Sequence, residues 1–93
     1  MRITPDNILA HELIGLNVFV KDCSDPTLSS LRGSVVDETR NTLKLKVDGK
    51  IKMVSKGVAT FIFTLPDGLE VGLEGWRLVG RPEERVARLR WRR

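Results

Sequence analysis

The sequence predicts a small all-β fold, built on a strongly bent antiparallel sheet with a short helix near each end. Three observations carry this prediction. Residues 43–48 alternate apolar and charged side chains with the period of two that a half-buried strand requires. The Asp48-Gly49 pair that follows is a strong signal for a tight hairpin turn, because a type I′ turn needs positive φ at both central positions. The chain has 93 residues, which suits one domain with a small core.

Residues 33–53 predict three strands joined by two tight turns. The first strand ends before Asn41, whose short amide side chain tolerates left-handed backbone angles. In the second strand, the apolar face is formed by Leu43, Leu45 and Val47, with Lys44 and Lys46 on the other face. In the third strand, we expect the apolar face to continue with Ile51 and Met53, while Lys50 and Lys52 point outward.

The N-terminal part predicts a helix over residues 4–13. Thr4 suits the N-cap, Pro5 suits the first helical position, and Gly15 ends the element. Residues 16–21 alternate as a strand, and residues 22–31 have the Ser, Asp, Pro and Thr content of a loop.

The C-terminal half begins with its most apolar segment, residues 58–65. We expect this strand to be buried on one face and covered by the N-terminal helix on the other. Two short strands are predicted at 69–73 and 76–79, with Gly72 and Gly75 bending the backbone at a corner. A helix begins at Pro82, because Glu83 and Glu84 favour the positive end of its dipole and arginines follow.

Five to seven short strands with tight turns describe a small antiparallel barrel of the SH3-like or Sm-like kind, in which closure removes exposed edges. The predicted organisation is an N-terminal helical segment over 1–15, a barrel over 16–80 and a basic C-terminal helix over 81–93. The sequence has no apolar run long enough to cross a bilayer and no secretory signal at its N-terminus. We therefore expect a soluble, cytoplasmic protein.

Positive charge is concentrated at the C-terminus. Residues 1–80 contain ten Lys or Arg and ten Asp or Glu, whereas residues 81–93 contain six Arg and two Glu, which accounts for the net charge of +4. Together with the lysines on the sheet, this predicts a polyanionic partner, recognised through its shape and phosphate backbone. Reading of individual bases is disfavoured: Phe19, Phe61 and Phe63 fall on apolar strands, which leaves Trp76 and Trp91 to stack.

The sequence shows no catalytic constellation. Cys23 and His11 are each the single residue of their kind, which argues against a transition-metal site or a nucleophile paired with a histidine. Asp37 and Glu38 are neighbours in a strand, so their carboxylates should point to opposite faces. The residues alone predict a binding protein without a metal or cofactor, and a protein-binding SH3-like or Sm-like module stays open beside a nucleic-acid-binding one.

Four sequence motifs resemble those of a known protein family. They are NILAHELIGL at 7–16, GSVVDETRNTL at 33–43, FIF at 61–63 with LPDG at 65–68, and GRPEER at 80–85. In this order they resemble the archaeal ribonuclease P protein component 1 family over nearly the whole chain. One departure lies near Ser30, where the resemblance leads us to expect a further glycine.

The resemblance implies an Sm-like barrel that acts as an RNA-binding subunit of ribonuclease P, the ribonucleoprotein that removes the 5′ leader from precursor tRNA. The catalytic component would be the RNA with its bound Mg²⁺, and this chain would hold no active site and no cofactor. The implied partners are ribonuclease P RNA, precursor tRNA in the holoenzyme and a zinc-binding protein subunit, while the chain alone would be a monomer.

Two sets of site residues follow from the cation pattern and the resemblance together. The residues expected to contact RNA are Arg40, Lys44, Lys46, Lys52, Lys56, Arg77, Arg81, Arg85, Arg88 and Arg92. The residues expected to contact the partner protein, at the N-terminal segment and the edge of the first strand, are Ile8, Leu9, Leu13, Leu16, Val18 and Val20.

Overall fold

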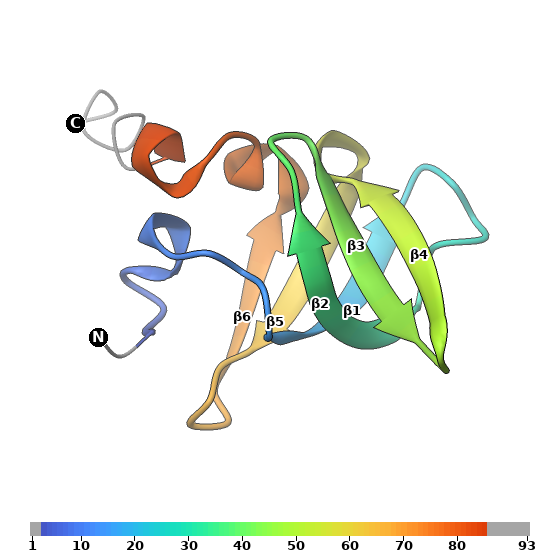
Figure 1. The fold of residues 1–93 in the computed structure, drawn as a ribbon, viewed down its shortest axis with the longest axis horizontal. Coiled ribbons are helices and arrows are strands. Elements are labelled where there is room, and N and C mark those ends of the chain that lie inside the picture. Colours follow the sequence, from blue (N-terminus) through green and yellow to red (C-terminus); the bar gives the residue numbers. More distant parts are fainter. Residues whose placement is uncertain (1–2, 86–93) are drawn as a thin grey trace.

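The computed structural model describes residues 3–85, which form one six-stranded antiparallel sheet in the order β4-β3-β2-β1-β5-β6 (Figure 1). The strands are β1 (Asn17–Cys23), β2 (Arg32–Glu38), β3 (Thr42–Val47), β4 (Lys50–Ser55), β5 (Ala59–Thr64) and β6 (Glu70–Glu74). Three short 3-10 turns complete them: η1 (Ile8–Ala10), η2 (Lys56–Val58) and η3 (Gly75–Leu78). The predicted all-β class is confirmed.

The sheet curls around a core on its inner face, but β4 and β6 stay its two edges and do not pair with each other in the described part of the chain. The inner face buries alternate residues of each central strand, such as Val20, Leu45, Phe61 and Phe63, all fully buried. Their alternation follows from the two-residue period of a strand. Barrel closure is therefore left as an expectation, while the bent sheet is observed.

The β3–β4 hairpin confirms the predicted turn and corrects the predicted face of β4. Asp48 and Gly49 have φ of 50° and 80°, as a type I′ turn requires. The two-residue turn pairs Val47 with Lys50, so Val54, and not Met53, returns to the core side. Ile51 and Met53 are 55% and 56% exposed. The prediction that they face inward was wrong because pairing across such a turn fixes the parity of every residue that follows.

The N-terminal helix predicted over 4–13 is only the single turn η1. The Asn7 side chain accepts a hydrogen bond from the Thr4 N–H, at 2.7 Å. His11 is already extended, with φ of −112° and ψ of 155°. The segment still buries Leu13 in the core. It does not cover the outward face of β5 as expected, since Ile62 on that face is partly exposed.

The predicted last strand at 76–79 is instead the 3-10 turn η3, and Gly75 explains why. A Cβ at Gly75 would lie 1.7 Å from the Lys56 carbonyl oxygen and 2.5 Å from that of Ala59. The backbone at the end of β6 therefore runs against η2, and the chain turns there into η3. The helix predicted from Pro82 is present over 82–85, and the rest of the predicted range, 86–93, lies outside the described residues.

Replacing Gly75 by Ala is expected to destabilise the fold by about 2 kcal/mol or more, because backbone atoms must move to admit a methyl group. Gly72→Ala is the matched control, since nothing lies within 4 Å of a Cβ built there. Urea unfolding of the two variants measures the difference. Equal unfolding midpoints would show that the close approach at Gly75 is not needed.

Ser30 lies in the loop where the resemblance led us to expect a glycine. Its φ is 70°, in the left-handed region that glycine adopts most readily. Its backbone N–H donates to the Val20 carbonyl at 2.7 Å, which holds the loop against β1. The loop thus keeps a glycine-like backbone shape although it carries a serine.

Candidate nucleic-acid interface

The structure places six of the predicted RNA-contacting cations at the surface, with Lys44 and Arg77 partly buried. They are Arg40, Lys44, Lys46, Lys52, Arg77 and Arg81. Two more predicted residues, Arg88 and Arg92, lie outside the described residues. Lys44 and Lys46 share the outer face of β3. Lys52 is on the edge strand β4 and pairs with the core residue Leu45, so it projects from the opposite face and the prediction that it points outward was wrong.

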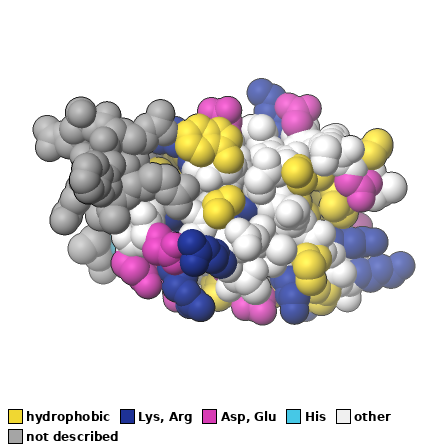
Figure 2. Space-filling view, turned by 90° about the horizontal axis from the view of Figure 1, so that it is seen from above, with side chains coloured by type: hydrophobic (Ala, Val, Ile, Leu, Met, Phe, Trp, Pro, Cys, Tyr) yellow, Lys and Arg dark blue, Asp and Glu magenta, His cyan; other side chains and the backbone are white. Residues whose placement is uncertain are grey.

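These cations do not form one continuous positive field. The Arg40 Nη2 atom lies 3.0 Å from Glu84 Oε2, and Lys44 Nζ lies 3.9 Å from Asp37 Oδ2. Figure 2 shows Lys and Arg side chains interspersed with Asp and Glu on the face seen from above. Exposed pairs of this kind are worth little, about 0–1 kcal/mol each, so their cations can exchange a carboxylate for a phosphate at small cost.

Lys56 and Arg85 were expected to contact RNA, and the structure places both of them in the interior. Their exposures are 0% and 1%. The Lys56 Nζ atom and the Arg85 Nη1 atom each lie 2.8 Å from Glu38 Oε2. Their charge is thus turned toward a shared carboxylate and away from any partner. We call Glu38, Lys56 and Arg85 the buried charge cluster.

Arg85 uses its guanidinium to join both ends of the described chain. Nε donates to the Leu9 carbonyl at 2.9 Å, and Nη2 donates to the His11 carbonyl at 2.6 Å. Nη1 donates to the carbonyls of Leu78 and Gly80 at 3.0 and 3.3 Å. A guanidinium is suited to this role because its donors diverge in one rigid plane. In Figure 1 the N-terminal segment and the start of the C-terminal helix accordingly lie on the same side of the sheet.

Glu38 and Lys56 carry opposite charges at the centre of the cluster. Burial acts to raise the pKa of Glu38, but hydrogen bonds from Lys56, Arg85 and the Leu13 N–H outweigh it and hold the pKa below its usual value. Burial lowers the pKa of Lys56, more than its bond to Glu38 raises it. Lys56 also donates to the carbonyls of Thr39 and Arg40 at 2.8 and 3.3 Å, so each of its N–H groups has an acceptor within reach.

The predicted partner-contacting residues are core residues. Their exposures run from 0% to 7%, for Ile8, Leu9, Leu13, Leu16, Val18 and Val20. In addition, β1 lies between β2 and β5 and presents no free edge. These side chains were read as an available apolar stripe, but the sheet needs them to complete its own core. Ile14, 48% exposed, is the apolar residue that this segment does present outward.

Sequence reasoning did not find the buried charge cluster, because its members are far apart in the chain. It treated Glu38 as the strand neighbour of Asp37 and Lys56 as a cation that contacts RNA. No described group of three or more His, Cys, Asp or Glu side chains comes together in residues 3–85. Within the same residues, no helix has the length and apolar character needed to span a membrane.

A curled all-β sheet with cations at its surface, and with its central carboxylate already bound by two buried cations, defines a small binding protein. Comparison with known proteins then gives the family. Residues 6–88 match the family model of Ribonuclease P/MRP, subunit p29. The chain belongs to this family.

Individual relatives agree with this assignment. The chain is 48% identical over 85 residues to ribonuclease P protein component 1 of Methanocaldococcus jannaschii, covering 90% of this chain and 88% of the relative. It is 47% identical over 92 residues to the protein of the same name from Pyrococcus abyssi, covering 99% of this chain and 71% of the relative. Among solved structures, Mth11, described as a homologue of the human RNase P protein Rpp29, is similar with a TM-score of 0.61 and 47% identity, covering 80% of this chain and 96% of that one.

Proposed function

We propose that this ribonuclease P subunit is a non-catalytic RNA-binding protein that supports the catalytic RNA in removing the 5′ leader from precursor tRNA. The match of residues 6–88 to the subunit family carries the proposal. The surface cations would provide the binding energy. Each Lys or Arg that contacts a phosphate releases condensed counterions and lowers the repulsion within folded RNA. Mg²⁺ would be held by the RNA and would supply the hydrolytic chemistry there.

The buried charge cluster supports a non-catalytic role for this chain. Glu38 is bound on one oxygen by Lys56 and Arg85 and on the other by the Leu13 N–H. A carboxylate held by two cations and a backbone N–H, with its pKa below the usual value, is stabilised as an anion and is poorly suited to act as a general base near neutral pH. The cluster positions the surface around it, and the RNA performs the reaction.

The proposed protein partner is a zinc-binding ribonuclease P subunit, and the structure changes where we expect it to dock. The core residues of the N-terminal segment are unavailable, so the contact would use the outward side of that segment. Exposed Ile14 lies there, beside Glu12, Arg40 and Arg81, around a small hollow. An apolar side chain ringed by charged ones is the usual composition of a protein interface.

Binding to ribonuclease P RNA across a salt series tests the proposed RNA contacts. A truncation must stop after Arg85, because a shorter chain would lose a member of the buried charge cluster. The full chain is compared with residues 1–85 and with a variant carrying Lys44→Gln, Lys46→Gln and Lys52→Gln. We expect both changes to flatten the salt dependence, by about 0.7–0.9 in slope for each phosphate contact that is lost.

The two altered forms separate the contribution of residues 86–93 to RNA binding from that of the lysines on the sheet. A flatter slope only on truncation would place the phosphate contacts at residues 86–93, and a flatter slope only in the lysine variant would place them on the sheet. Two results would contradict the proposal: an unchanged slope in both forms, or undiminished cleavage by the holoenzyme at limiting Mg²⁺ when this chain is omitted.

A further inference from the structure

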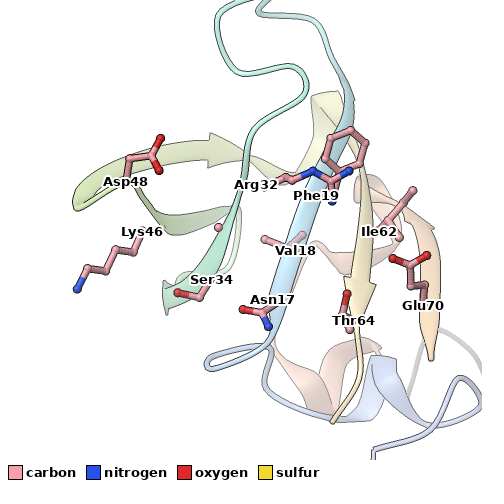
Figure 3. Close-up of a pocket in the computed structure, with 11 residues that line it drawn as sticks. Asn17, Val18, Phe19, Arg32, Ser34, Lys46, Asp48, Ile62, Thr64 and Glu70 are labelled. Atoms are coloured by element: carbon pink, nitrogen blue, oxygen red, sulfur yellow. The ribbon is translucent and has the colours of Figure 1, made fainter. Parts of the chain in front are cut away.

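The outer face of the sheet has a surface hollow of about 440 Å³. Its lining comes from β1, β2, β3, β5 and β6 together with the Asp48 turn, and it includes the core residue Val18. Figure 3 shows its side chains arranged in two adjacent rows across the strands. Strand pairing generates these rows, because residues paired in an antiparallel sheet project from the same face.

The first row is polar and crosses five strands. It runs through Lys46, Ser34, Asn17, Thr64 and Glu70 in the order β3, β2, β1, β5 and β6. Within the described residues, the side chains of Asn17, Ser34 and Thr64 make no hydrogen bond to the protein. Three neighbouring side chains of one sheet face thus offer both donors and acceptors to a ligand.

The second row offers a flat stacking surface. Arg32 and Ile62 flank Phe19 on either side, and the Arg32 guanidinium carbon lies 4.4 Å from the centre of the Phe19 ring. Figure 3 shows the Arg32 side chain lying against this ring. The cation–π contact holds an exposed guanidinium plane in one orientation, which lowers the entropy lost when something stacks on it.

The balance of charge in the lining of the hollow favours a nucleobase over a duplex backbone as its ligand. Arg32 and Lys46 are balanced by Asp48 and Glu70, so the lining has no net charge. A duplex backbone would need an excess of cations here, whereas a nucleobase is neutral and carries donors and acceptors on its edge. A planar base stacked on Arg32 would bring that edge to the polar row, with Lys46 left for the adjoining phosphate.

We propose that this hollow binds an unpaired nucleotide of single-stranded RNA, with the base stacked on the Arg32–Phe19 pair and its edge bonded to Asn17 and Thr64. The inference rests on the proposed RNA-binding function and adds a site that recognises a base and not only phosphates. It also revises the sequence reasoning, which set Phe19 aside as a residue of an apolar strand.

Titration of the full chain with an unstructured eight-nucleotide RNA, followed by amide NMR, tests the site. Shifts are expected at the amides of β1, β2 and β5 that line the hollow, and an RNA duplex of equal length should not produce them. Arg32→Lys keeps the charge but loses the plane, and we expect at least about fivefold weaker binding, the lower end of the value of one base stack. Thr64→Val removes one hydrogen bond and is expected to cost about two- to tenfold.

Lys21→Gln is the control, because it removes a whole charge from an exposed site outside the hollow. A larger loss in Arg32→Lys than in Lys21→Gln would support stacking over simple charge. The proposal is overturned if the shifts are absent or lie elsewhere, if Arg32→Lys binds like the unaltered chain, or if the partner protein alone covers these amides. Failure of the proposed function is separate, since it would appear as an unchanged salt slope with ribonuclease P RNA whatever happens at the hollow.

Discussion

Replacing Glu38 by Gln is expected to destabilise the protein by about 3–5 kcal/mol, as measured by urea unfolding. The substitution nearly preserves the size of the side chain but leaves the charges of Lys56 and Arg85 buried without an anion. Their exposures of 0% and 1% leave no water to take the place of the carboxylate. Removing one partner of a buried ion pair costs more than the pair itself contributes, because the remaining charge is not compensated.

Lys56→Met provides the matched comparison within the same cluster. It leaves Glu38 and Arg85 as a balanced pair 2.8 Å apart and fills the space of the lysine stem with apolar atoms. We expect a smaller loss than in Glu38→Gln, and its source would be the carbonyls of Thr39 and Arg40, which lose a donor. An equal or larger loss in Lys56→Met would show that uncompensated charge is not what destabilises the Glu38 variant.

The pH dependence of the unfolding free energy is a second test of the buried charge cluster. Because the pKa of Glu38 lies below its ordinary value of 4.5 in the folded protein, its contribution is fully present above 4.5 and is lost as the pH falls through the folded pKa. The unaltered protein should therefore lose stability more steeply than Glu38→Gln over this acidic range. Parallel curves of unfolding free energy against pH would contradict this assignment.

Replacing Arg85 by Met is expected to cost about 3–5 kcal/mol and to loosen the N-terminal segment in particular. The guanidinium donates to the carbonyls of Leu9 and His11 on one side and Leu78 and Gly80 on the other, and a thioether can donate to none of them. Amide hydrogen exchange measures the local effect. The His11 N–H, which donates to the Ile8 carbonyl at 3.1 Å, should exchange faster.

Arg81→Gln is the control for Arg85→Met, because Arg81 is an exposed arginine four residues earlier in the same segment. We expect a change within about 0.5 kcal/mol, as is usual for a surface substitution. If Arg85→Met unfolds at the same urea concentration as Arg81→Gln, the contacts of Arg85 contribute nothing to the fold.

Local pattern was enough to predict most of the sheet. Alternation in β3, the Asp48-Gly49 turn and the apolar run of β5 are features of a few consecutive residues, and the structure confirms them. The error at Ile51 and Met53 was also local. The predicted turn already fixed their parity, and apolar character was given more weight than register.

The buried charge cluster lay beyond such reasoning. Glu38 is 18 residues from Lys56 and 47 from Arg85, and neither spacing has a period that a helix or strand would reveal. A lysine or arginine is also usually exposed, so nothing in the local sequence marks these two as buried. The apolar residues of the N-terminal segment were misplaced for a different reason. Only the complete fold shows which apolar residues are buried in the core and which stay at the surface.

The bond from Arg85 to Leu9 spans 76 positions of the chain and closes nearly all of it into one loop. Small proteins often close such loops with a disulfide, which this chain with its single cysteine cannot form within itself. The guanidinium joins the same two ends in the folded state only, because its hydrogen bonds break on unfolding and do not constrain the unfolded chain as a disulfide would. The two ends of the fold are therefore expected to order and to open together, so that whatever holds one end in place also fixes the other.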